Sequence, residues 1–188
     1  MSLATWQETL IAAQVDGSPL SNTTTPTSLL NAGSKFTLPA NFFAFVGKTV
    51  RITAAGRMTT VITTPGTLTL DFRLGATAVI TTGAMTQNIV VKTNLPWFYQ
   101  VTATLRAVGS TANFMPSGFI LGEGFLNVAT QAVGPGPGGF VLPFIPNIPV
   151  VGSNFDSTAS QVVDFFGTYG TANLCSITLH QFMLESLN

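Results

Sequence analysis

The segment TLTLDFRL, residues 67–74, alternates strictly between two kinds of side chain. Its four apolar residues point to one side, while the threonines, Asp71 and Arg73 point to the other. Alternation with a period of two is typical of a half-buried strand in an antiparallel sheet. Pro65-Gly66 before the segment and Gly75 after it are turn signals. The segment therefore predicts one strand of an all-β fold.

The same alternation recurs along most of the chain. It is clear in YQVTATLRAV (99–108) and in TVRITAAGRMTTVI (49–62). Within the second of these, Gly56 indicates a bulge after which the facing of the side chains can switch. In the C-terminal run the apolar phase shifts between Leu179 and Phe182, which again indicates a bulge. Weaker patterns predict further strands, and the first of them also fits a short helix: 6–15, 77–81, 88–92, 118–126, 161–169 and 174–187.

These strands predict an antiparallel β-sandwich. Many strands with turn signals about every 8–12 residues and almost no helix are typical of a sandwich or barrel. Only residues 39–43 fit a single helical turn. A chain of 188 residues can bury an ordinary core as one domain, so we expect residues 1–188 to form a single sandwich. A jelly roll is the expected arrangement at this length.

The composition points to a subunit of an assembly. Only 7% of the residues are charged, with seven basic against seven acidic, whereas an ordinary soluble domain has about 25%. Roughly one residue in seven is threonine, which favours strands and tolerates water on a sheet surface. Such a surface must be kept wet by hydroxyls and amides or be covered by other subunits. We expect neither nucleic acid nor a membrane as a partner, because no basic cluster and no run of about 18 apolar residues is present.

Residues able to carry out chemistry are scarce and scattered. The chain has one histidine, His180, and one cysteine, Cys175, so a zinc site would need ligands from other subunits. The glycine-rich run at 134–139 lacks the Lys-Ser/Thr of a phosphate-binding loop. Asp71 and Arg73 are interpreted as a solvated or cross-strand ion pair. We expect no enzyme, metal or cofactor.

One segment, about 129–153, lacks the alternating pattern of the predicted strands. Its glycine-rich start leads into FVLPFIPNIPVVG (140–152), whose prolines at 143, 146 and 149 disfavour sheet pairing. A long loop of this kind is usually functional, and its large apolar side chains need a cover. It either folds back over its own sandwich or forms an arm that packs on another subunit. The interface candidates in it are Phe140, Val141, Leu142, Phe144, Ile145, Ile148 and Val150.

A second candidate is the aromatic run Trp97-Phe98-Tyr99 that follows Pro96. Exposed Trp and Tyr rings stack on sugars while their polar tips stay wet. The run could therefore be a ligand-binding patch. The alternative, which the run favours, is the start of a strand whose rings anchor the core.

Four segments give the chain a family resemblance: SKFTLPANFF (34–43), TTPGTLTLDFRLG (63–75), NLPWFYQVTATLRAVG (94–109) and FDSTASQVVDFFGTYGTANLCSITLHQFMLESLN (155–188). They resemble small structural proteins encoded by tailed bacteriophages and prophages. The resemblance implies a virion component with a β-sandwich or jelly-roll fold. It further implies a trimeric capsid decoration or cement protein, or a part of the tail or fibre, and it carries no catalytic motif.

Together these observations give one main hypothesis and one alternative. The main hypothesis is a capsid decoration (cement) protein, assembled in the host cytoplasm. As a homotrimer it would stabilise the head by multivalent apolar and backbone contacts to the major capsid protein or other virion subunits. The alternative is a tail or fibre component that binds host-surface glycan through Trp97, Phe98 and Tyr99.

Overall fold

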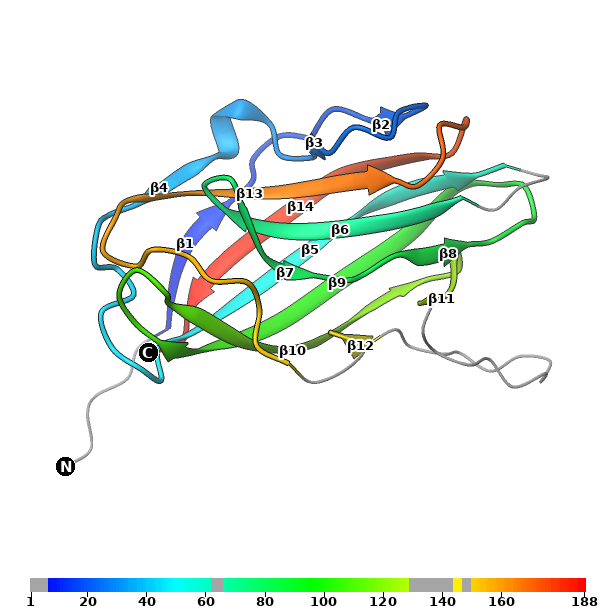
Figure 1. Ribbon diagram of the computed structural model, residues 1–188. Coiled ribbons are helices and arrows are strands. Elements are labelled where there is room, and N and C mark those ends of the chain that lie inside the picture. The colour runs from blue at the N-terminus through cyan, green and yellow to red at the C-terminus, as the bar shows by residue number, and fades with distance from the viewer. Residues whose placement is uncertain (1–6, 62–65, 129–143, 147–149) are drawn as a thin grey trace.

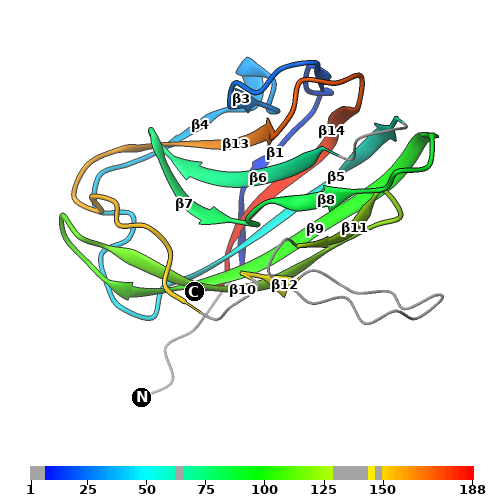
Figure 2. The same ribbon diagram turned by 45° about the vertical axis from the view of Figure 1, so that its right-hand side comes forward.

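The computed structural model describes residues 7–61, 66–128, 144–146 and 150–188, and these residues form two antiparallel sheets. Sheet A runs in the order β1 (Glu8–Ala12), β14 (Ser176–Ser186), β5 (Thr49–Thr60), β9 (Lys92–Ala107), β10 (Asn113–Gly122) and β12 (Phe144–Ile145), with β2 (Leu20–Ser21) also paired to β14. Sheet B runs in the order β11 (Phe125–Val128), β8 (Met85–Gln87), β6 (Thr67–Leu74), β13 (Gln161–Tyr169) and β3 (Thr27–Ser28); β4 (Phe36–Leu38) also pairs with β13, and β7 (Thr77–Thr81) with β6. Figures 1 and 2 show the sheets as two facing layers. The β-sandwich is thus confirmed, while the jelly-roll arrangement stays a prediction.

The alternating segment at 67–74 is a strand, β6, as predicted. Its residues Leu68, Leu70, Phe72 and Leu74 are buried between the sheets. Across the core, the ring of Phe165 on β13 lies 5.2 Å from Tyr99 on β9 and 5.8 Å from Phe182 on β14, measured between centroids. Phe165 therefore joins the two sheets at the centre of one hydrophobic cluster.

The bulge predicted at Gly56 lies on the neighbouring strand instead. In β5 the even-numbered residues face the core from Val50 through Met58, so the facing never switches. The register shifts in β14, between Leu179 and Gln181. His180 is the extra residue, and it lets Leu179 and Phe182 both face the core. The bulge inferred from the phase shift in the C-terminal run is therefore confirmed.

Three local expectations differ from the structure. Residues 40–43 form a hydrogen-bonded turn without helix, since Phe42 N–H donates to the Pro39 carbonyl at 3.1 Å. The one described helical turn is the 3-10 turn η1 (Ala32–Ser34), capped by the Asn31 side chain. The strand expected at 88–92 does not form there, and the neighbouring short strand is β8 (Met85–Gln87). After it the chain turns, because the Asn88 side chain accepts a hydrogen bond from the Val90 N–H. The strand expected at 118–126 is two strands, β10 and β11, separated by a turn at Glu123-Gly124.

The proline-rich segment has a short paired part. Phe144 and Ile145 form β12 against Phe119 and Gly118 of β10. Ile145 is buried in the core, so it is not available as an exposed interface residue. Val150 is 54% exposed and keeps its place as a candidate. The side chain of Phe144 and the candidates Phe140, Val141, Leu142 and Ile148 lie outside the described residues.

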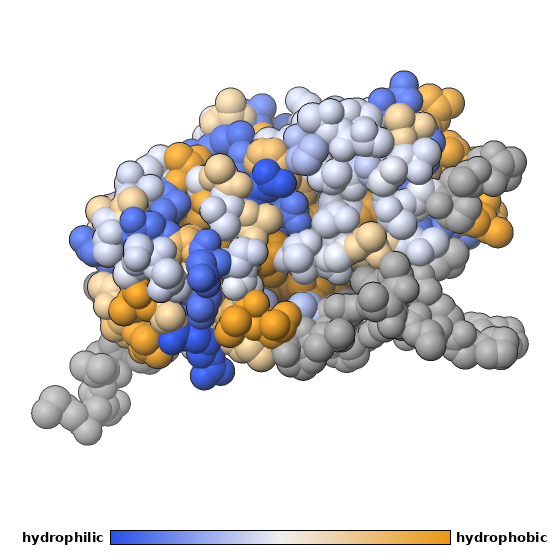
Figure 3. Space-filling view, viewed as in Figure 1, coloured by the Kyte–Doolittle hydropathy of each residue, from blue (hydrophilic) through white to orange (hydrophobic). Residues whose placement is uncertain are grey.

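The outer side of sheet B carries paired charges and a largely neutral surface. Asp164 on β13 accepts a hydrogen bond from Ser28 Oγ at 2.6 Å and pairs with Lys35 Nζ at 2.5 Å. Arg73 pairs with Asp71 at 3.1 Å and lies over the Phe166 ring. Asp71 is only 7% exposed, so this is a covered pair within one strand, not a solvated one. In Figure 3, pale residues of intermediate hydropathy gather towards the upper and central right of the view, and strongly hydrophilic and hydrophobic residues are mixed at its left.

Candidate binding face on sheet A

The predicted aromatic patch divides between the two sides of sheet A. Trp97 and Tyr99 face inward and are 2% and 0% exposed. The indole N–H of Trp97 donates to the Arg57 carbonyl at 3.2 Å, and burial raises the pKa of Tyr99. Successive residues of a strand point to opposite faces, so only Phe98 points outward. The expected patch of three rings therefore does not form, and two of the three anchor the core.

Phe98 belongs to a regular array of side chains on the outer face of sheet A. The pairing of β14, β5, β9 and β10 places residues directly opposite one another in rows across the four strands. One row is Gln181, Ala55, Phe98 and Leu121; the next is Met183, Thr53, Gln100 and Phe119; the third is Glu185, Arg51, Thr102 and Ser117. The face is therefore a mixture of apolar and neutral polar groups, with one row that holds an ion pair.

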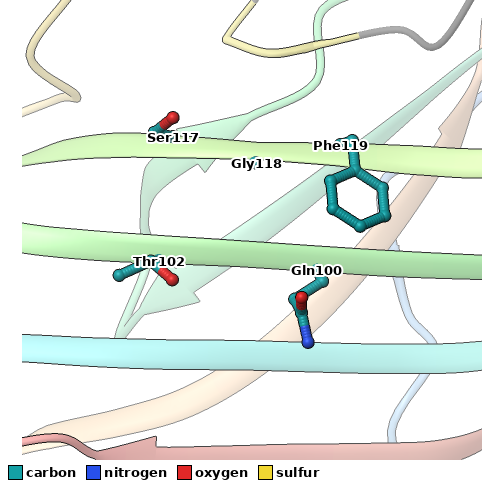
Figure 4. A pocket seen from close by; sticks show the side chains of 5 residues that line it. All are labelled: Gln100, Thr102, Ser117, Gly118 and Phe119. Carbon is teal, nitrogen blue, oxygen red and sulfur yellow. The ribbon is translucent and has the colours of Figure 1, made fainter.

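A shallow hollow of about 260 Å³ lies on this face between β9 and β10. Gln100 and Thr102 line it from β9, and Ser117, Gly118 and Phe119 line it from β10 (Figure 4). Figure 4 shows the Phe119 ring leaning from β10 towards β9, where Gln100 lies. The hollow thus combines one aromatic ring, one amide and two hydroxyls, none of them titratable near neutral pH.

The polar groups of the hollow differ from their neighbours in their hydrogen bonding within the described part of the chain. Thr104, the next outward threonine on β9, is already engaged with Thr49, at 3.2 Å between the two hydroxyl oxygens. The side chains of Gln100, Thr102 and Ser117 make no such bond to any residue in the described part of the chain. Among the described residues, their donors and acceptors are thus unpaired and lie at fixed positions on two paired strands.

Phe119 has a second ring beside it. The centroids of Phe119 and Phe98 lie 6.3 Å apart, with their planes tilted by 38°. Both rings are half-buried, so part of each remains open to solvent. Together they form an apolar patch, in which Phe119 lines the hollow and Phe98 lies beside it.

A second hollow, of about 310 Å³, lies on the same face. It is lined by Ala12, Ala13, Thr53, Gln181, Phe182 and Met183. Thr53 at its edge is directly opposite Gln100 at the edge of the first hollow. The two hollows are therefore neighbours along a single row of the sheet.

The row next to the one that joins the two hollows holds an ion pair. Arg51 Nε donates to Glu185 Oε2 at 2.7 Å, and the Gln7 amide also donates to Glu185. The hydrogen bond from Arg51 is the main cause that lowers the pKa of Glu185 below its ordinary value, with burial opposing it. The same bond raises the pKa of Arg51. The pair joins β14 to β5 and leaves neither of its own two charges unpaired beside the hollows.

This ion pair predicts a specific loss of stability in acid. A carboxyl group whose pKa is lowered by folding stabilises the protein above its unfolded pKa, near 4.5. That stabilisation is lost as the pH falls through the folded pKa. We expect Glu185→Gln to lower the free energy of unfolding by about 2 kcal/mol at pH 7 and to have much less effect at pH 3. Urea unfolding of both proteins at the two pH values measures this; an equal difference at pH 7 and pH 3 would contradict it.

The single cysteine and the single histidine, Cys175 and His180, do not line either hollow. Cys175 is a buried free thiol, and burial is the main cause that raises its pKa. His180 Nδ1 lies 2.8 Å from Asp16 Oδ1 at the bulge of β14. Within the described ranges no group of three His, Cys, Asp or Glu side chains could hold a metal ion. No helix in those ranges is long and apolar enough to cross a membrane.

Sequence reasoning found Phe98 but missed Gln100, Thr102, Ser117 and Phe119. A signal was present in β9, since Phe98, Gln100, Thr102 and Thr104 share the outward phase of the strand. What the sequence could not supply was the partner strand. Only the register of β9 with β10 brings Phe119 opposite Gln100.

Comparisons with known proteins give little beyond this geometry. No protein-family model and no curated protein matches the chain. One similar solved structure is the CBM2 module of the evolved Dit of Lactobacillus casei BL23 phage J-1. It is 10% identical over 99% of both chains, with a TM-score of 0.34. A likeness at this level carries no conclusion about function.

Proposed function

We propose that this chain is a structural subunit of a bacteriophage virion, carried on the tail or fibre, that binds host-surface glycan through the outer face of sheet A. The observation that carries the proposal is the hollow formed by Gln100, Thr102, Ser117 and Phe119. Aromatic faces stack on sugar rings, and neutral amides and hydroxyls bond to their hydroxyl groups. The glycan alternative thereby gains a site other than the one the sequence suggested.

Two further observations support a virion origin. The segments that resemble phage structural proteins include β6, most of β9, and β13 with β14, which build both sheets. The resemblance thus lies in the framework of the sandwich and is not limited to loops. The low charge also suits a protein present in many copies, whose surface is partly covered by its neighbours.

Capsid decoration is the second candidate, and one observation favours it. Ile89, Val90 and Val91 are exposed by 52%, 54% and 49%, and Leu174 by 73%. The pairings of Lys92 with Thr60 and of Ser176 with Thr59 place both groups at one end of sheet A. Such an apolar end could be covered by another virion subunit, in a trimer or on the head.

Cryo-EM of purified particles tests the proposal directly. We expect density for this sandwich on the tail or its fibres, with the outer face of sheet A directed away from the particle. Density at three-fold and quasi-three-fold positions of the head would overturn the tail assignment in favour of decoration. If purified particles contain no density for this chain at any position, the virion assignment itself is overturned.

A further inference from the structure

We infer that the outer face of sheet A binds an uncharged oligosaccharide along a track that crosses four strands from Met183 to Phe119. The biological source of the sugar rests on the proposed function. The binding itself is a property of the isolated chain, so it can be tested without the virion.

The course of the track follows from the register. Met183, Thr53, Gln100 and Phe119 are directly opposite one another on β14, β5, β9 and β10. Neighbouring strands lie about 4.8 Å apart, so the row is roughly 14 Å long. One hollow lies at each end of it, and Thr53 and Gln100 join them. The row thus offers room for several linked sugar rings instead of one.

The chemistry of the lining selects sugars among small polar ligands. At one end of the row, the rings of Phe119 and Phe98 present apolar faces to the C–H faces of a sugar ring. At the other end, Met183 and Ala12 form an apolar wall. Between them, Gln100 offers one acceptor and two N–H donors, and Thr53 offers a hydroxyl. Alternating apolar faces and hydroxyl edges are the surface that a pyranose chain presents.

The charges of the face favour a neutral sugar over an acidic one. No charged side chain lines either hollow. In the adjacent row, Arg51 is occupied by Glu185. Arg57 on β5 and Arg106 on β9 also point outward. Each lies four residues along its strand from that strand's lining residue, Thr53 or Thr102, or about 13 Å away. A uronate or sialic acid placed on the track would therefore lose hydration without gaining an ion pair.

An NMR titration of the full chain tests this inference. The probes are four neutral trisaccharides built from glucose in α and β linkage, galactose and N-acetylglucosamine, with trigalacturonate as the charged counterpart. We expect at least one neutral trimer to shift the amide resonances of Gln100, Thr102, Ser117 and Phe119. Trigalacturonate should bind more weakly than that trimer.

Two variants locate the binding. Gln100→Ala should weaken it about tenfold, since the amide's hydrogen bonds are lost. Phe119→Ala should weaken it by about tenfold or more through loss of stacking. Thr69→Ala, an outward threonine on β6 of sheet B, is the matched control and should leave the affinity unchanged. Because Gln100 is outward and makes no described contact in the core, its variant remains informative even if Phe119→Ala unfolds.

The outcomes separate the two proposals. The inference is overturned if no neutral trimer shifts these resonances, if trigalacturonate binds equally well, or if Gln100→Ala binds like the wild type. Sugar binding by the isolated chain combined with a position on the head would overturn the tail assignment alone. A position on the tail without sugar binding would overturn the track and leave the virion assignment intact.

Discussion

Replacing Gly56 by alanine will lower the free energy of unfolding by about 4 kcal/mol, more than any surface change in the protein. A Cβ at this position would lie 1.9 Å from the carbonyl oxygen of Thr178 and 3.0 Å from Nε1 of Trp97. The oxygen belongs to the backbone of β14 beside its bulge, so it cannot turn away as a side chain could. Alanine normally stabilises a strand relative to glycine by about 0.5–1 kcal/mol, which is too little to offset this clash.

Thermal unfolding of matched variants measures the effect. For a chain of this size, about 4 kcal/mol corresponds to a fall in Tm of roughly 8–16 °C. Gly33→Ala is the control, because its Cβ would meet only the Asn31 side chain, at 3.5 Å, in an exposed turn. The control should change stability by less than about 0.5 kcal/mol. Equal Tm values for the two variants would show that β5 and β14 do not approach as closely as described.

Phe165→Ala is the second large effect, with an expected loss of about 4 kcal/mol. The ring is fully buried and touches Tyr99 and Phe182 of the opposite sheet. Its removal leaves a cavity in the centre of the core. The surrounding strands are held in place by their backbone hydrogen bonds, so they cannot move in to fill it. The loss therefore includes both the transfer of the ring and the energy of the cavity.

The neighbouring residue provides the control for this prediction. Phe166 points outward, and the guanidinium carbon of Arg73 lies 4.1 Å from the centroid of its ring. Phe166→Ala removes that surface contact and should cost about 1 kcal/mol. Urea unfolding of the two variants compares how much the inward and outward faces of β13 contribute to the free energy of unfolding. A loss as large for Phe166→Ala as for Phe165→Ala would mean that the facing of β13 is wrong.

The sheet class could be predicted because it depends on local alternation. In β6 each apolar residue faces the core, as the pattern at 67–74 indicates. Gly56 shows where local reasoning ended: a glycine in a strand marks either a bulge or a close approach. The choice depended on the backbone of β14, more than 100 residues away in the chain.

The candidate site could be predicted only in part, for a related reason. The sequence drew attention to Trp97 and Tyr99 because large aromatic residues suit sugar binding, but the same size makes them good core residues. Gln100 and Thr102 carried no motif and became notable only opposite Phe119 and Ser117. A binding surface on a sheet is a property of strand register, which period-two alternation leaves undetermined.

The bulge of β14 has a consequence for how the sequence can change over time. His180 is partly exposed, and its pair with Asp16 is a surface contact worth at most about 1 kcal/mol. Many side chains could therefore replace it at little cost. Deleting His180 would remove the bulge and make Leu179, Gln181 and Phe182 consecutive, so a regular strand would still bury Leu179 and Phe182. Deleting a residue in the regular part of β14 is different, because the side chains beyond the gap would then face the opposite side of the sheet. Natural variation in β14 should therefore concentrate both substitutions and single-residue gaps at position 180 and avoid gaps in the regular parts of the strand.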